Sequence, residues 1–255
     1  MRVVAVTQSD PFFTGRFFAS FLEELEGGPV QLVEVVVLAN FNESRVALAR
    51  RLLRLYGVVD FARLVRRYVA ARVGDARGAP SSVEAIARSR GVPVRPLASV
   101  NNPEYLAELE RNEVDVLLSV ASPEIFGRAA LEAASLVLNV HNGKLPDYRG
   151  MMPTFWALLN GDRQIVITLH EMAERIDAGG VLAEFPLDVE PGESAFDLAA
   201  RAKVVAGREV ARYLVRLAGG GKALPARTPT ERGRYYGFPR RSDARALRAS
   251  GRRML

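Results

Sequence analysis

The chain of 255 residues has no cysteine, only three lysines and only two histidines. Without cysteine it can form no disulfide bond, no thiolate metal site and no cysteine nucleophile, so we expect an intracellular, cytoplasmic protein without a metal site. No uninterrupted apolar run approaches the roughly 20 residues that a membrane-spanning helix needs. The apolar start of the chain is broken at once by Ser9, Asp10 and Pro11, which is unlike a signal peptide.

Arginine carries nearly all of the positive charge in a chain whose formal net charge is +6. A hot habitat or a GC-rich genome explains such a bias as readily as a polyanionic partner does. Charge alone therefore does not argue for nucleic acid, and we expect no nucleic-acid partner.

Short apolar runs alternate with amphipathic segments along the chain. The pattern predicts strands at residues 2–7, 30–38, 92–97, 115–120, 136–140, 165–169 and 181–189, and helices at 15–26, 83–89, 103–112, 124–134 and 195–217. This alternation indicates an α/β fold with an open, mostly parallel, Rossmann-like sheet. Ligands of such sheets bind beyond the carboxyl ends of the strands, which directs attention to the strand that ends at Val140.

Two regions depart from this alternation. Residues 222–255 are rich in Arg, Pro and Gly, so they form either a small C-terminal extension of a main domain at 1–221 or a solvated, partly ordered tail. Residues 40–80 look like a helical insertion with one apolar stripe, made of Phe61, Leu64, Val65, Tyr68, Val69 and Val73. The stripe packs on the chain's own sheet, or else it makes a homodimer contact or a contact with a membrane surface.

Asn139 and His141 stand two residues apart at the end of a predicted strand, so their side chains point to the same side of the sheet. Gly143, Pro146 and Gly150 tighten the loop that follows, which would leave the imidazole at the rim of the sheet rather than under a covering layer. The other histidine, His170, is interpreted as a structural residue that at most lines the site.

From Asn139 onward, the order and spacing of several short motifs resemble the formyltransferase family, which includes methionyl-tRNA, glycinamide ribonucleotide and amino-sugar formyltransferases. The motifs are Asn-Val-His at 139–141, Leu-Pro-Asp-Tyr-Arg-Gly at 145–150, the Pro153–Trp156 stretch, Asn-Gly-Asp at 160–162, Thr168 and Asp-Ala-Gly at 177–179. The resemblance covers most of residues 80–217, and it implies that residues 1–221 form a folate-dependent catalytic domain for one-carbon transfer.

The resemblance implies catalytic roles for Asn139, His141 and Asp177. When an amine attacks a formyl carbon, negative charge builds on the formyl oxygen, and Asn139 with a protonated His141 could donate hydrogen bonds to it. A proton must then pass from the attacking nitrogen to the leaving nitrogen. A carboxylate near His141 favours the imidazolium and can relay that proton. Without the upstream motifs, Asp177 would read as a turn residue before two glycines.

The same resemblance implies that the formyl donor, 10-formyltetrahydrofolate, binds between two loops. One loop consists of Ser122, Pro123, Glu124 and Ile125, and the other of Glu174, Arg175 and Ile176. Arg175 stands where the family usually has glycine, and Asn142, Gly143 and Lys144 replace the usual Pro-Ser or Gly-Ser after the histidine. We expect Asn142 and Lys144 to contact the acceptor, and both departures bear on specificity.

The favoured interpretation is transfer of a formyl group to an amine of a small acceptor, such as an amino-sugar nucleotide or another phosphate-bearing molecule. The alternatives are a formyltetrahydrofolate hydrolase, which would use the same three residues, and a methionyl-tRNA or glycinamide ribonucleotide formyltransferase. The complete triad argues against a mere binding protein. Residues 7–15 lack a Gly-x-Gly-x-x-Gly cradle, which argues against a nicotinamide-dependent dehydrogenase.

Overall fold

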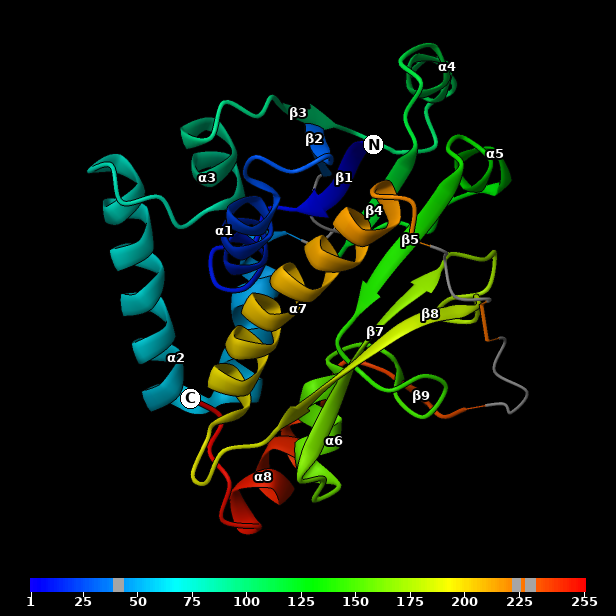
Figure 1. Cartoon of the computed structure of the whole chain (residues 1–255). Helices are drawn as coiled ribbons and strands as arrows, with labels where there is room; N and C mark the ends of the chain where they lie inside the picture. The colour runs from blue at the N-terminus through cyan, green and yellow to red at the C-terminus, as the bar shows by residue number, and fades with distance from the viewer. Residues whose placement is uncertain (39–43, 222–225, 228–232) are drawn as a thin grey trace.

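The computed structural model describes residues 1–38, 44–221, 226–227 and 233–255. Its centre is a seven-stranded sheet in the order β3-β2-β1-β4-β5-β7-β8 (Figure 1). The strands are β1 (Arg2–Gln8), β2 (Gln31–Leu38), β3 (Val94–Leu97), β4 (Val116–Val120), β5 (Leu136–His141), β7 (Gln164–Glu171) and β8 (Val181–Asp188). The first five strands in this order pair in parallel, whereas β7 pairs antiparallel with both of its neighbours, β5 and β8. The predicted α/β fold with a mostly parallel open sheet is therefore confirmed.

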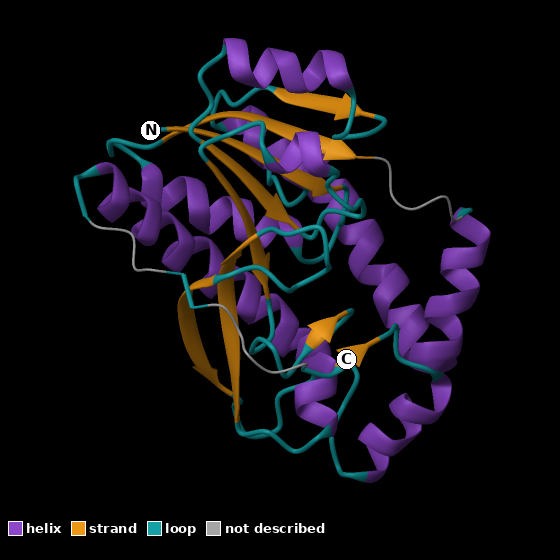
Figure 2. Ribbon diagram, turned by 90° about the vertical axis from the view of Figure 1, so that its right-hand side faces the viewer, coloured by secondary structure: helices purple, strands orange, loops and turns teal. Residues whose placement is uncertain are grey.

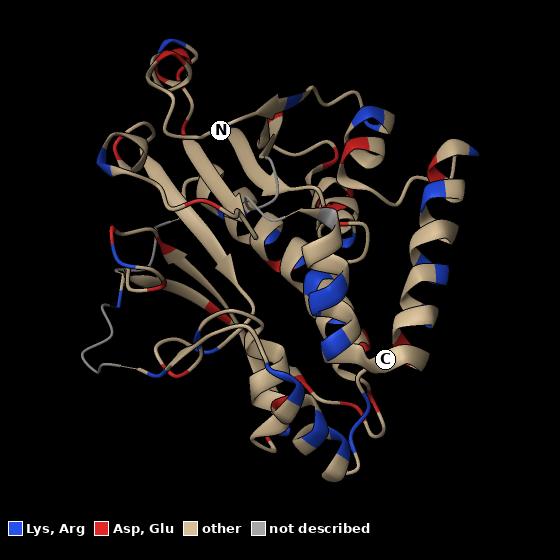
Figure 3. Ribbon diagram, turned by 180° about the vertical axis from the view of Figure 1, so that it is seen from behind, with Lys and Arg blue, Asp and Glu red and all other residues tan. Residues whose placement is uncertain are grey.

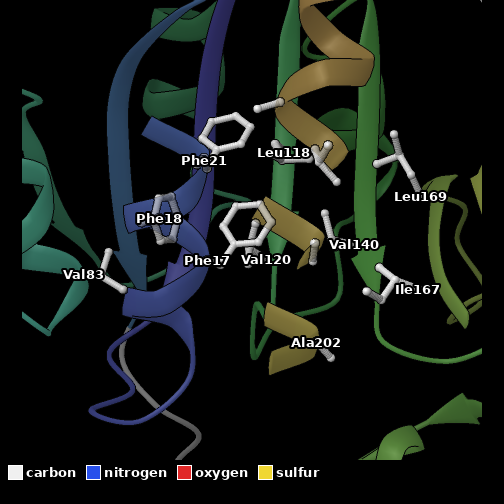
Figure 4. Packing of buried hydrophobic residues seen from close by; sticks show 14 of the residues in the cluster. Phe17, Phe18, Phe21, Val83, Leu118, Val120, Val140, Ile167, Leu169 and Ala202 are labelled. Atoms are coloured by element: carbon white, nitrogen blue, oxygen red, sulfur yellow. The ribbon is translucent and has the colours of Figure 1, made fainter. Parts of the chain in front are cut away.

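Helices pack on both faces of this sheet (Figure 2). The larger core lies under α1 (Thr14–Leu25), α3 (Val83–Ser89) and α7 (Ala195–Ala218). Phe17 of α1 lies beside Val120 of the sheet, and Phe18 lies on the side of Val83 of α3 (Figure 4). The smaller core lies under α4 (Pro103–Arg111) on the opposite face. Because successive side chains of a strand alternate between faces, each central strand contributes to both cores.

The face of the sheet that carries the smaller core changes from apolar to polar toward the carboxyl ends of the central strands. Leu117 of β4 and Val137 of β5 belong to the smaller core, but the residues two positions further along, Ser119 and Asn139, are polar, and His141 follows on the same face. The sheet thus presents polar groups on the face, and at the strand ends, where ligands of parallel sheets bind.

The helix predicted at residues 124–134 is wrong in extent, because only α5 (Arg128–Leu131) is helical there. The Glu124 carboxylate accepts hydrogen bonds from Ser99 Oγ (2.5 Å) and from the Val100 backbone N–H (2.7 Å). The Gly127 N–H donates to Asn101 Oδ1 (2.6 Å). These contacts tie residues 124–127 to the loop before α4, so their polar groups are used outside a helix.

The insertion is one bent helix, α2 (Arg45–Ala76), with a break at Gly57, whose φ of 78° favours glycine. Leu64 is buried, but Val65, Tyr68, Val69 and Val73 of the predicted stripe are 41–53% exposed, so the stripe packs on the chain only in part. Arginines lie along this helix (Figure 3). A homodimer or membrane contact through its exposed side stays a prediction, and residues 39–43 lie outside the described part of the chain.

The last residues of the chain are built into the fold rather than forming a solvated tail. Ala244 and Leu247 of α8 (Arg241–Ala249), with Met254 and Leu255, are buried in the larger core. The short strand β9 (Tyr235–Tyr236) pairs in parallel with β6 (Arg149–Gly150), just before α6 (Pro153–Leu159). Within the described residues, no helix is long and apolar enough to cross a bilayer.

Candidate active site

Asn139 is held on both sides by residues of the neighbouring strands. It lies in register with Ser119 of β4 and with His170 of β7. The Ser119 hydroxyl donates to Asn139 Oδ1 (2.9 Å), and Asn139 Nδ2 donates to His170 Nε2 (3.0 Å). A side-chain amide has two N–H donors, and the described residues provide a partner for one of them, so the second can bind a reacting oxygen.

His170 is the neutral partner that orients this amide. Burial, with the nearby imidazole of His141 as a smaller cause, lowers the pKa of His170 to about 4. Its Nδ1–H donates to the Glu171 carbonyl (2.7 Å), which leaves the Nε2 lone pair to accept from Asn139. His170 thus lines the site, and its contact with Asn139 sets the orientation of the amide.

His141 is covered, contrary to the prediction that its imidazole lies at the rim. Its side chain is 7% exposed. Loop 142–150 folds back over it, because Thr168 Oγ1 donates to the Gly143 carbonyl (2.8 Å) and His141 Nε2–H donates to the Tyr148 carbonyl (2.6 Å). A carbonyl only accepts, so neutral His141 carries its proton on Nε2 and leaves the Nδ1 lone pair to take a second proton.

Asp177 reaches the site from the loop between β7 and β8. Its Oδ1 lies 3.6 Å from His141 Nδ1 and 3.8 Å from His170 Nε2. Its Oδ2 accepts a hydrogen bond from the Gly150 N–H (2.7 Å), and its φ is 50°, in the left-handed region. This conformation costs roughly 1–3 kcal/mol for a residue other than glycine, and such residues cluster at functional sites. Asn139, His141 and Asp177 therefore converge on one side of the sheet.

The two loops assigned to the donor are both described, and they differ in character. In the first, the Ser122 hydroxyl accepts from the Glu124 N–H (3.4 Å), the Glu124 carboxylate is occupied by the 99–101 loop, and Ile125 is 61% exposed. In the second, Glu174 and Arg175 are exposed, and Ile176 is 41% exposed while its carbonyl accepts from the Arg149 guanidinium. Each loop thus presents one apolar side chain to solvent.

The residues assigned to the acceptor lie on the loop after His141. Lys144 pairs with Asp147 at 3.3 Å, and both side chains are about half exposed (54% and 51%). Asn142 Oδ1 is buried and makes no hydrogen bond with any described residue. An unpaired buried acceptor costs free energy, so this oxygen is a candidate partner for an N–H of a bound molecule.

Sequence reasoning missed several groups that complete the site. The Tyr148 carbonyl and the Gly150 N–H act through the backbone, so residue identity carries no signal for them. Ser119 was detectable, because it is the one polar residue in the Val-Leu-Leu-Ser-Val run of β4. His170 was noticed, but its contact with Asn139 depends on the antiparallel register of β7 against β5.

Comparison with known proteins identifies a family for the chain. The family model described as formyl transferase matches residues 69–213, more than half of the chain. A methionyl-tRNA formyltransferase from Synechococcus sp. (strain JA-3-3Ab) is 31% identical over 166 residues, which are 64% of this chain and 51% of that protein. The chain thus spans about half the length of that curated relative.

Solved structures of low sequence identity share the fold. A glycinamide ribonucleotide transformylase from Symbiobacterium toebii superposes with a TM-score of 0.61 at 15% identity, covering 89% of this chain and 93% of that one. A sugar N-formyltransferase from Shewanella sp FDAARGOS_354 superposes with a TM-score of 0.58 at 17% identity, covering 93% of this chain and 77% of that one. Sequence and fold agree, and the chain belongs to the formyl transferase family.

Proposed function

We propose that this protein transfers a formyl group from 10-formyltetrahydrofolate to the amine of a small acceptor. The observation that carries the proposal is the convergence of Asn139, His141 and Asp177, with the Asn139 amide oriented by its two neighbours and Asp177 facing His141 Nδ1. The amine nitrogen attacks the formyl carbon, the bond from that carbon to N10 of the folate breaks, and the proton lost by the amine ends on N10.

Each of the three residues has one task in this reaction. The free N–H of Asn139 donates to the formyl oxygen as negative charge builds on it. His141 Nδ1 takes a proton from the attacking nitrogen, and the charge of Asp177 stabilises the imidazolium that forms. The 3.6 Å between Nδ1 and Asp177 Oδ1 is too long for a good hydrogen bond. The proton relay between them therefore runs through a water or through the substrate nitrogen.

The donor is proposed to lie between residues 122–125 and 174–176, with Ile125 and Ile176 against the pterin. Adding folinic acid, a stable formyl-folate, should slow backbone amide exchange in both loops, as measured by hydrogen–deuterium exchange with mass spectrometry. The second arm of α2, residues 58–76, is the internal control and should exchange as before. Protection that spares both loops would show that the donor site is wrongly assigned.

The acceptor is proposed to be an amino-sugar nucleotide or another amine that carries phosphate. Lys144 supplies a cation on the loop beside His141, and Asn142 Oδ1 supplies an acceptor for the amine N–H. Both a sugar N-formyltransferase and a glycinamide ribonucleotide transformylase share this fold, so a direct assay must identify the acceptor.

Purified protein with 10-formyltetrahydrofolate should release tetrahydrofolate only when the right amine is added. The amines to compare are amino-sugar nucleotides, glycinamide ribonucleotide and methionyl-tRNA, with folate release followed by absorbance. Release that is equally fast without any amine would mean that the protein hydrolyses the donor. Release with methionyl-tRNA alone would refute the proposal that the acceptor is a small molecule.

Lys144→Ala should raise the KM of a phosphate-bearing acceptor more than it lowers kcat, as measured by steady-state kinetics.

A further inference from the structure

The segment of residues 233–237, here called the C-terminal strap, lies along the loop that covers His141. Figure 1 shows its strand β9 beside the green loop that leads to α6. The Arg149 N–H donates to the Arg234 carbonyl (3.0 Å), and the Met151 N–H donates to the Tyr236 carbonyl (2.8 Å). The strap therefore binds the backbone on both sides of Gly150.

Side chains fasten the strap at the same place. The Tyr236 ring stacks on Tyr148 (5.5 Å between centroids, 17° between planes) and packs at 4.9 Å from the Trp156 ring. Asn160 Nδ2 donates to the hydroxyls of both tyrosines at 3.1 Å. At the start of the strap, a Cβ on Gly233 would lie 1.5 Å from the Pro146 carbonyl oxygen, so only glycine allows this approach.

The backbone that the strap holds is the backbone that holds the candidate catalytic pair. The Tyr148 carbonyl accepts from His141 Nε2, and the Gly150 N–H donates to Asp177 Oδ2. Arg149, between them, donates from its guanidinium to the Ile176 carbonyl, next to Asp177. One short stretch of chain thus contacts the strap on one side and both His141 and Asp177 on the other.

We propose that the C-terminal strap positions the His141–Asp177 pair and that Tyr236 is its principal positioning residue. The proposal rests on the proposed function, in which His141 and Asp177 move the proton. Tyr236 acts through Tyr148 and Gly150, since its contacts among the described residues are with the loop, α6 and Arg234 of the strap rather than with the catalytic side chains. A displacement of about 1 Å at a reacting group can cost on the order of 100-fold in rate, so a small shift of this loop matters.

Tyr236→Ala should lower kcat by about 10-fold to 100-fold and leave the KM for 10-formyltetrahydrofolate nearly unchanged. Tyr236→Phe keeps the ring stack and loses only the hydroxyl contacts with Asn160 and Arg234, so it should restore most of the rate. Tyr235→Ala is the matched control, because Tyr235 is its neighbour on the same strand and is 56% exposed. Thermal melts of all three variants separate a rate effect from a loss of fold.

The chain's two histidines give a readout that needs no acceptor. Nitrogen-15 NMR distinguishes the two imidazole tautomers, and neutral His141 should carry its proton on Nε2 while His170 carries it on Nδ1. Tyr236→Ala should move part of the His141 population to the Nδ1–H form, because the Tyr148 carbonyl is no longer held in place. The His170 signal should stay unchanged, and His170→Ala assigns it.

A double mutant tests the route of the effect. If Tyr236 acts through His141, then adding Tyr236→Ala to His141→Ala should cause no further loss of kcat. Normal kcat in Tyr236→Ala with a lower melting temperature would overturn the proposal, and so would a higher kcat, which would mean that the strap restrains access. If Tyr236→Ala does not fold, Gly233→Ala displaces the strap at its other end and is judged by the same criteria. Normal turnover in His141→Ala would instead refute the proposed function.

Discussion

His141→Ala is expected to lower turnover by about 100-fold to 10,000-fold, the range for losing a group that transfers a proton and supports a developing charge. The structure gives the reason, because His141 Nδ1 is the ring nitrogen left free to accept a proton and Asp177 faces it. Alanine supplies neither the base nor the positive charge of an imidazolium. Single-turnover release of tetrahydrofolate in the presence of the acceptor measures the effect on chemistry directly.

Two controls separate this effect from misfolding or loss of the donor. The His141→Ala variant should still bind folinic acid with the same pattern of amide protection, because the proposed donor contacts lie on other loops. Its melting temperature should fall only modestly, since the imidazole packs at the end of β5 rather than in either core. Turnover near the normal value would refute the mechanism proposed for this residue.

Asp177→Asn should be comparably severe in turnover while the protein stays folded. Asparagine has nearly the same shape, tolerates the left-handed conformation seen at this position, and can still accept from the Gly150 N–H. The negative charge that favours the His141 imidazolium is lost, and an amide NH2, which cannot accept a proton, replaces the carboxylate oxygen that faces His141 Nδ1. Because a charge at a functional site seldom adds to stability, we expect an unchanged or slightly higher melting temperature.

Asp177→Ala provides the comparison for this change, in which the shape of the side chain is kept. It removes both the charge and the hydrogen bond from Gly150, so it should lower turnover at least as much and also destabilise the loop between β7 and β8. If Asp177→Asn kept its rate while Asp177→Ala lost it, the role of Asp177 would be to hold the loop. The carboxylate would then have no part in moving the proton.

The sequence predicted the sheet, and the shared face of two candidate site residues, where a local rule applied. Alternation of side chains along a strand places Asn139 and His141 on one face, and β5 does carry both on the face of the smaller core. Continuous apolar runs predicted the buried parallel strands β1, β2 and β4. Asp177 could be identified only through the family motif. Its loop folds back onto the sheet through contacts that the pattern of apolar and polar residues does not predict.

The predictions from sequence were wrong where polar side chains form hydrogen bonds with backbone groups far away in the chain. Residues 124–134 have a helical pattern, but Glu124 and the Gly127 N–H bond to the loop before α4, and the helix shrinks to a single turn. The two-residue strand β9 has no pattern to detect, because its partner lies about 85 residues earlier in the chain. The covered position of His141 follows from that same packing of the loop.

The last residues of the chain complete structures that begin much earlier. The Arg253 and Met254 carbonyls accept from the first N–H groups of α7, and the strap braces the loop over His141. Contacts between residues this far apart in sequence form late in folding. Closing a long segment costs conformational entropy before the contacts can stabilise the chain. During synthesis these residues follow every other described element, so a growing chain would hold a folded sheet with an unbraced site. If the strap positions the catalytic pair as proposed, the full catalytic rate would be reached only after residues 233–255 had joined the fold.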